Sequence, residues 1–171
     1  MKRLLLLTIL ALATACSAGQ MQTDPHLGKQ LDLHVQDLAT GKAVDPATWR
    51  GRVVLVDLWA SWCESCKEAM PHHARLWHDL RSRGFEVVAI SVDEDVAAAQ
   101  QFLREMPLPF TVLWDAGQRT VTELAPPAMP TAYVLDRTGT VVAVAIGGTS
   151  EALRTIDAAV AAALDATPAA R

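Results

Sequence analysis

The chain has 171 residues, a formal net charge of −4 at pH 7 and 51% hydrophobic residues. This length suits one compact domain, and this hydrophobic content excludes an intrinsically disordered chain. The charge excludes a nucleic-acid-binding module, which needs a clustered basic excess. The three cysteines are an odd number and make a poor disulfide framework, so they need another explanation.

The first residues have the pattern of a secretory signal, because Lys2 and Arg3 precede an apolar run at 4–15. That run is shorter than the ~20 residues that a membrane-spanning helix needs. Residues 13–15 fit the cleavage site of an ordinary signal peptidase. The same residues followed by Cys16 resemble a bacterial lipobox, in which the cysteine is lipidated, and we favour this second interpretation.

The rest of the sequence predicts how the chain is organised into segments. We expect a signal peptide at 1–15, an anchor or tether at 16–30, one domain at 31–166 and a flexible tail at 167–171. Seven short apolar segments predict strands, at 31–35, 43–44, 53–59, 85–92, 110–114, 131–135 and 140–146. Four segments predict helices, starting near 63 and ending before 84, then at 96–106, 121–125 and 151–166. Ser150 is the expected N-cap of the last helix.

The run at 53–59 is nearly all apolar and β-branched, which is typical of a strand buried on both faces. Such strands occur in parallel sheets covered by helices. The alternation of strands and helices therefore predicts an α/β fold, with a mixed sheet and helices on both of its faces.

Two cysteines, Cys63 and Cys66, lie where this strand ends and a helix begins. The first turn of a helix has unpaired N–H groups and the positive end of the dipole, and both favour a thiolate. Cys66 lies one turn further along, close enough to close a disulfide. We expect a reversible couple in which Cys63 attacks a substrate disulfide and Cys66 resolves the mixed disulfide. A fixed structural disulfide is the alternative, although so short a loop stabilises little.

The surrounding sequence resembles the thioredoxin superfamily, and most closely the exported TlpA/ResA-like thiol:disulfide oxidoreductases. Residues 53–71, VVLVDLWASWCESCKEAMP, are similar to that family's active-site strand and helix. Residues 128–136, AMPTAYVLD, are similar to its second signature. The resemblance covers about residues 28–166 and implies a thioredoxin-like fold. Residues 93–125 resemble the helix-strand insertion that separates this family from minimal thioredoxins.

The resemblance also implies roles for single residues. Pro130 would follow a cis peptide bond and offer the Met129 backbone to an extended substrate chain; an ordinary trans proline that starts a strand is the alternative. Asp57 matches an acid that thioredoxins carry six positions before the first cysteine. Burial in an apolar strand should raise the pKa of Asp57, so we expect it to take the proton from Cys66. A partly solvated structural aspartate is the alternative.

Three neighbours of the cysteines receive smaller roles. We expect Trp62 to shield Cys63 and to contact partners, since an indole ring provides both apolar area and a polar edge. Lys67 should stabilise the thiolate, whereas Glu64 should oppose it.

A copper carrier is one competing interpretation, with Cys63, Cys66 and His73 as ligands, and His72 or His78 as further options. This set loosely resembles the copper-binding pattern of related thioredoxin-fold assembly proteins, but those carriers place three residues between the cysteines. Surface histidines on a polar helix face are the simpler explanation.

A peroxidase is the second competitor. The peroxiredoxin pattern Pro-x-x-x-Thr-x-x-Cys would need proline at position 56 and threonine at position 60, where this chain has Val56 and Ala60. The same pattern also fails for Cys66, so we expect no peroxidase.

The sequence thus predicts an exported thiol:disulfide oxidoreductase of the bacterial cell envelope, lipid-anchored at Cys16 or otherwise soluble in the periplasm. We expect no cofactor and no resident metal beside the Cys63–Cys66 couple. The expected partners are disulfide-containing envelope proteins, for example in cytochrome c maturation or copper-site assembly, and a membrane thiol reductase of the DsbD type as electron donor. We expect a monomer without a nucleic-acid partner. The Glu64-Ser65 pair between the cysteines leaves the reduction potential open.

Overall fold

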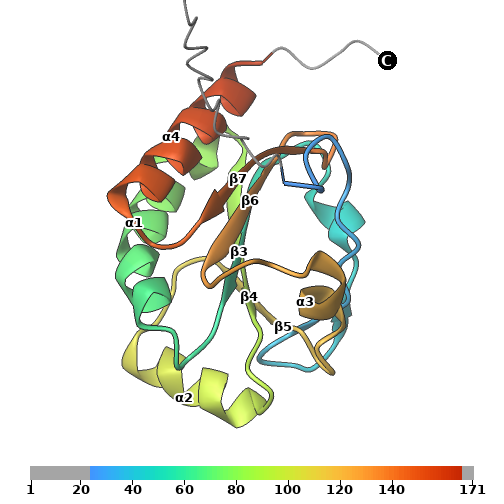
Figure 1. The fold of residues 1–171 in the computed structure, drawn as a ribbon, viewed down its shortest axis with the longest axis vertical. Helices are drawn as coiled ribbons and strands as arrows, with labels where there is room; N and C mark the ends of the chain where they lie inside the picture. Colours follow the sequence, from blue (N-terminus) through green and yellow to red (C-terminus); the bar gives the residue numbers. More distant parts are fainter. Residues whose placement is uncertain (1–23, 167–171) are drawn as a thin grey trace, which may run out of the picture.

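A seven-stranded mixed sheet forms the centre of the computed structural model, which describes residues 24–166 (Figure 1). The strand order is β2-β1-β5-β4-β3-β6-β7. The strands are β1 Val35–Asp37, β2 Ala43–Val44, β3 Val53–Trp59, β4 Phe85–Ser91, β5 Thr111–Trp114, β6 Thr131–Leu135 and β7 Val141–Ile146. The predicted signal peptide, Cys16 and the predicted tail at 167–171 lie outside the described residues.

The centre of the sheet is parallel and its margins are antiparallel. Strand β3 pairs in parallel with β4, which pairs in parallel with β5, while β6 runs antiparallel to β3. All seven residues of β3 are buried, as its apolar run predicts. The C-terminal end of β3, where the chain turns toward the cysteines, is therefore held by strands on both sides.

Four α-helices flank the sheet, and their bounds are α1 Glu64–Leu80, α2 Val96–Glu105, α3 Arg119–Leu124 and α4 Ser150–Asp165. Helices α1 and α4 lie together on one side and α3 lies on the other (Figure 1). Helix α4 packs on β3, β6 and β7, and α1 packs on β4. The structure thus has the predicted mixed sheet with helices on both faces. The segment that resembles the family insertion contains α2, β5 and α3.

Two short 3-10 helices complete the elements, at Pro46–Trp49 and Arg81–Arg83. The first was not predicted, although Asp45 caps it by accepting a hydrogen bond from the Ala47 N–H. Proline suits the first position of a helix, because an N–H group there would have no partner within the helix.

The structure corrects the predicted N-cap of α4. Thr149 is the N-cap, because its hydroxyl accepts a hydrogen bond from the Ala152 N–H at 3.2 Å and its backbone is extended. Ser150 is already the first residue of the helix. Both residue types are good caps, and the extended backbone decides between them.

The folded domain also begins earlier in the chain than the predicted residue 31. Residues 24–30, predicted as part of a tether, lie along the start of β7: the Gly28 N–H donates to the Val141 carbonyl at 2.9 Å, and the Val141 N–H donates to the Lys29 carbonyl at 2.8 Å. These bonds give the start of β7 a second neighbour. No helix within residues 24–166 is long and apolar enough to cross a membrane.

Candidate active site

The two cysteines form a disulfide at the start of α1, with their Cα atoms 5.3 Å apart. Cys63 is the N-cap, and its sulfur accepts a hydrogen bond from the Cys66 N–H at 3.2 Å. One backbone N–H group of the first helical turn is therefore directed at the Cys63 sulfur. Cys63 is 6% exposed whereas Cys66 is fully buried. A partner molecule can thus reach the first sulfur of the pair more easily than the second.

The loop before β6 lies against this helix start. The Met129–Pro130 peptide bond is cis, as the resemblance implies, and the Pro130 carbonyl accepts a hydrogen bond from the Gly147 N–H at 2.7 Å. The Ser65 hydroxyl lies 3.5 Å from the Met129 carbonyl oxygen and 3.6 Å from the Cys63 sulfur. The structure therefore brings the predicted Met129 and Pro130 beside the cysteines, although they are distant in sequence.

Gly148 makes a close approach that the sequence analysis missed. A Cβ atom at this position would lie 2.6 Å from the Ser65 carbonyl oxygen. This distance is shorter than any ordinary contact, and the obstacle is backbone, which cannot swing aside. The loop between β7 and α4 can therefore touch the residues between the two cysteines only because position 148 has no side chain.

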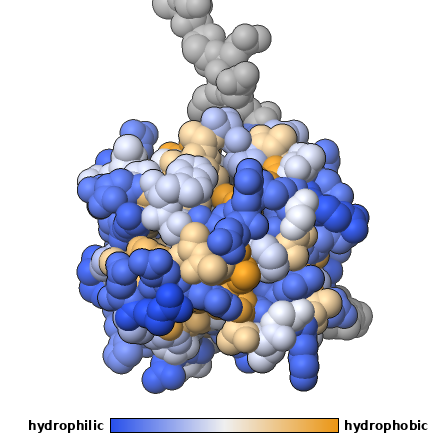
Figure 2. Space-filling view, turned by 90° about the horizontal axis from the view of Figure 1, so that it is seen from below, coloured by the Kyte–Doolittle hydropathy of each residue, from blue (hydrophilic) through white to orange (hydrophobic). Residues whose placement is uncertain are grey.

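A groove of about 740 Å³ is lined by Trp62, the residue before Cys63, and by Met129. Three acidic residues from the segment after β4, Asp93, Glu94 and Asp95, line it as well. Trp62 is 67% exposed and is the most exposed large hydrophobic residue of the described chain. Figure 2 views the molecule from the end where α1 starts, with apolar surface near the centre and hydrophilic residues around it.

The Lys67 and Glu64 side chains, predicted to have opposite effects on the thiolate, pair with each other. The Lys67 ammonium lies 3.2 Å from the Glu64 carboxylate, and it lies 6.0 Å from the centre of the Phe102 ring. Because the pair is largely solvent-exposed on the Glu64 side, its contribution to stability is small.

Asp57 lies in the middle of β3 and is 1% exposed. Its neighbours in register are small, namely Ala89 on β4 and Ala132 on β6. Neither carboxyl oxygen has a hydrogen-bond partner. Burial without a donor disfavours the charged form and raises the pKa of Asp57 to about 8. The prediction of a buried carboxyl that titrates near neutrality therefore has a physical basis in the fold.

His73 is buried next to this carboxyl, so the interpretation as a surface histidine is wrong for this residue. It is 1% exposed, and its Nε2 atom lies 3.8 Å from Asp57 Oδ2. Burial is the main reason why the pKa of His73 falls to about 4, with nearby His72 adding to the effect. Sequence reasoning missed this contact. The available signal was that His73 follows Cys66 by seven positions, which places both on one helix face.

The structure does not bring the predicted copper ligands Cys63, Cys66 and His73 together. Seven helical residues separate Cys66 from His73 by about 10 Å along the axis, and within residues 24–166 these three do not form a group with ligand atoms within 4.8 Å of one another. His72 instead pairs with Asp157 of α4 at 2.8 Å, and His78 is exposed near the end of α1.

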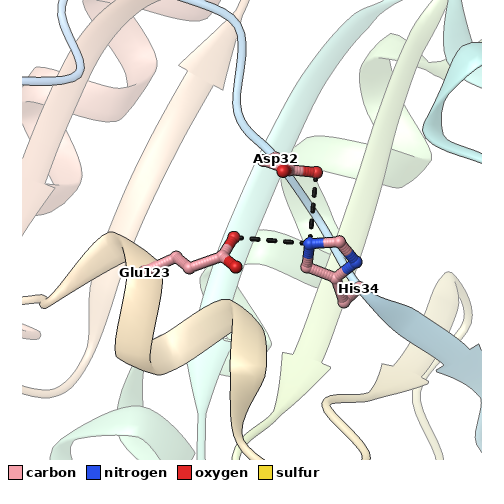
Figure 3. Close-up of side chains that lie close together, drawn as sticks. All are labelled: Asp32, His34 and Glu123. Atoms are coloured by element: carbon pink, nitrogen blue, oxygen red, sulfur yellow. Dashed lines mark ion pairs between the residues drawn. The ribbon is translucent and has the colours of Figure 1, made fainter.

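One other group could in principle hold a metal ion, formed by Asp32, His34 and Glu123 (Figure 3). His34 Nε2 lies 3.3 Å from Asp32 and 3.4 Å from Glu123. The same nitrogen already accepts a hydrogen bond from Arg119 at 3.0 Å, which engages the lone pair that a metal would need. We interpret the group as a surface charge network.

The comparisons with known proteins agree with this geometry. The AhpC/TSA family matches residues 28–144. A thiol-disulfide oxidoreductase ResA from Bacillus thuringiensis (strain Al Hakam) is 29% identical over 121 residues, which cover 71% of this chain and 70% of that protein. The ResA protein of Bacillus subtilis (strain 168) is 28% identical over 113 residues, or 66% of this chain and 63% of that protein.

Solved structures give the same result. A crystal structure from Chlorobium tepidum, provisionally named thiol:disulfide interchange protein DsbE, has a TM-score of 0.75 and 30% identity, and the match covers 81% of this chain and 97% of that one. Because Val56 and Ala60 stand where a peroxiredoxin pattern needs proline and threonine, the oxidoreductase relatives describe this site better. The chain belongs to the AhpC/TSA family, and within the thioredoxin superfamily it is a TlpA/ResA-like thiol-disulfide oxidoreductase.

Proposed function

We propose that this oxidoreductase is exported and reduces disulfides in other proteins of the cell envelope. The observation that carries the proposal is the asymmetry of the pair: Cys63 is reachable at the helix N-cap, and Cys66 is fully buried behind it. An accessible sulfur suits attack on a partner, and a buried one suits the intramolecular second step.

The reduction proceeds in two steps. In the dithiol form, the Cys63 thiolate attacks one sulfur of the substrate disulfide, which breaks the S–S bond, forms a mixed disulfide and releases one substrate thiolate. Cys66 then gives its proton to Asp57 and attacks the Cys63 sulfur, which releases the second substrate thiolate. Two electrons pass to the substrate, and the cysteine pair ends as the disulfide seen in the structure. A membrane thiol reductase of the DsbD type restores the dithiol.

The substrate chain lies in extended form across the Met129 backbone, with the exposed Trp62 ring beside it. The Ser65 hydroxyl, which lies near both the Met129 carbonyl oxygen and the Cys63 sulfur, supports this arrangement. The groove beside Trp62 gives room for residues next to the substrate cysteine. Disulfides of cytochrome c maturation factors or of copper-site proteins are the substrates that we propose.

The signal-like residues 1–15 support export, and the Cys16 context supports a lipid anchor. Metabolic labelling with a radioactive fatty acid tests the anchor. The full chain should incorporate the label, and Cys16→Ala should not. Equal labelling of both proteins would contradict lipidation at Cys16 and leave the oxidoreductase activity untouched.

Trapping tests the function itself. Cys66→Ala expressed with the natural export signal should accumulate mixed disulfides through Cys63, and mass spectrometry of the adducts names the substrates. Cys63→Ala is the matched control and should trap nothing. Cys66→Ala without adducts under mild oxidation would contradict the proposal. The direction follows from the reduction potential measured against glutathione, for which related dithiols span about −270 to −120 mV.

A further inference from the structure

The Asp57 and His73 side chains form a buried polar pair that lacks the usual hydrogen bonds. Both Asp57 oxygens and His73 Nδ1 have no partner, and His73 Nε2 faces Asp57 Oδ2 at 3.8 Å. Buried polar groups are nearly always hydrogen-bonded, since an unpaired one costs about 1–3 kcal/mol. Two such groups facing each other, slightly beyond hydrogen-bond distance, can satisfy each other by a small movement.

Among the described residues, His73 is the ionisable side chain that pairs with Asp57, whereas His73 also has two titratable neighbours of its own. Ala89 and Ala132 flank Asp57 on β4 and β6, so neither strand brings a charge to it in register. The groups that act on His73 from elsewhere are His72 on its own helix and Asp157 on α4. These two pair with each other at 2.8 Å, toward the solvent side of the α1–α4 contact.

The pair also lies on the inner face of the active-site helix. The buried residues of α1 are Cys66, Ala69, Met70 and His73, which follow the spacing of one helix face. That face is directed at the sheet, where Asp57 stands. Cys66 therefore lies on the same face of α1 as His73, whose imidazole faces the β3 carboxyl.

We propose that His73 is a positioning residue for Asp57, and that the two side chains share one proton, so that the imidazole takes over the shared proton when the carboxyl accepts the proton of Cys66. This inference rests on the proposed function, since it concerns the second step of the exchange. Burial raises the pKa of Asp57 and lowers that of His73, so between about 4 and 8 the pair binds one proton.

The protons balance through the step. Before it, the shared proton is on Asp57, and His73 is a neutral imidazole. The Cys66 thiol transfers its proton to Asp57 as Asp57 passes the shared proton to His73, and the resulting thiolate attacks Cys63. The pair then holds two protons and returns one to solvent, as the departing substrate thiolate takes up one. His73 thus lets the carboxyl accept a proton without requiring a lone carboxylate in an apolar core.

The test compares three variants in single-turnover oxidation of the reduced protein by oxidised glutathione from pH 5 to 9. The rate measured is the concentration-independent step, in which Cys66 resolves the mixed disulfide. His73→Leu should shift the pH midpoint upward by about one unit, which makes the step about tenfold slower at pH 7. His73→Gln, which supplies a polar amide that cannot take up a proton, should also shift the pH midpoint upward. His78→Gln removes an exposed histidine of the same helix and should match the wild type.

The outcomes separate the two proposals. A wild-type protein that does not react with oxidised glutathione would contradict the proposed function. A reactive wild type with unchanged midpoints in both His73 variants would overturn only the shared proton. If His73→Leu does not fold, nitrogen NMR of the imidazole decides. Asp57→Asn should abolish the change in the His73 nitrogen shifts that accompanies loss of the shared proton near pH 8, and a His73 titration identical to that of the wild type would overturn the proposal.

Discussion

Asp57 and Asp115 are both buried carboxyl groups next to the central strands, yet their surroundings are opposite. Asp115 follows β5 and accepts hydrogen bonds from the Thr120 and Val121 N–H groups at 3.0 and 2.8 Å, which holds the start of α3. Asp57 accepts none. Because N–H donors replace lost water, the first environment accommodates a charge and the second resists it. Asp115 therefore belongs to the architecture and Asp57 to the chemistry.

Asp93 resembles Asp115 in this respect. Its carboxylate accepts hydrogen bonds from the Ser61 N–H at 3.0 Å, the Ser61 hydroxyl at 2.7 Å and the Ser91 hydroxyl at 2.9 Å. These bonds fix the segment between β3 and Cys63. The hydrogen-bonded Asp93 carboxyl thus holds the active-site turn at Ser61. The Asp57 carboxyl, four residues before that turn in the chain, has no hydrogen-bond donor.

The largest predicted effect separates Asp57 from Asp115 by rate. Asp57→Asn should slow the resolution step about 100-fold at pH 7, because the amide cannot accept the Cys66 proton. Asp115→Asn should leave that rate unchanged. Stopped-flow oxidation by glutathione disulfide measures both. Equal rates for wild type and Asp57→Asn across pH 6–9 would remove Asp57 from the mechanism.

Stability should separate the same two residues in the opposite sense. Asp115→Ala leaves two buried N–H groups without a partner and should cost about 3 kcal/mol of unfolding free energy. Asp57→Asn loses no hydrogen bond and should cost nothing at pH 8. Urea unfolding of both variants gives the comparison. An Asp57→Asn protein as destabilised as Asp115→Ala would show that Asp57 is also structural.

The pH dependence of stability sharpens the contrast. The pKa of Asp57 is about 8 in the fold against its ordinary value of 3.8, so the folded state keeps a proton that the unfolded chain loses, and stability falls as pH rises from about 4 to 8. His73, with a pKa near 4 against 6.5, acts in the opposite direction below pH 6.5. The two effects cancel there.

Between pH 6.5 and 8, Asp57 is the member of the pair that changes the unfolding free energy with pH. The wild type should lose about 2 kcal/mol over this range relative to Asp57→Asn. Thermal or urea unfolding at closely spaced pH values measures the difference between the two proteins. A constant difference across this range would mean that Asp57 is ionised in the fold.

The smallest predicted effect concerns the hydrogen-bonded carboxyl. Ser61→Ala removes one donor to Asp93 and leaves the others, so it should cost about 1 kcal/mol of unfolding free energy. Ser82→Ala, in an exposed position of the second 3-10 helix, is the control and should be neutral. If the two variants are equally stable, the Asp93 network contributes less than its geometry suggests.

The local patterns of the sequence predict much of this molecule. The apolar run of β3 and the cysteines at the following helix start are visible within a few residues. The strands and α-helices occur in the expected order, although β1 begins at Val35 and not at residue 31. Contacts between segments that are distant in the chain could not be predicted from local sequence patterns. The pairing of Gly28 and Lys29 with Val141 has no local pattern. His73 looks like a polar surface residue until the position of α1 above β3 is known.

Gly148 has a consequence for the tolerance of this chain to change. The position has no side-chain atom for the chemistry and lies outside both signatures. Yet a single added methyl group would collide with the Ser65 carbonyl oxygen and displace the turn that holds the disulfide. In a saturation library selected for redox activity, position 148 should therefore be depleted of every replacement, as strongly as the two cysteines themselves.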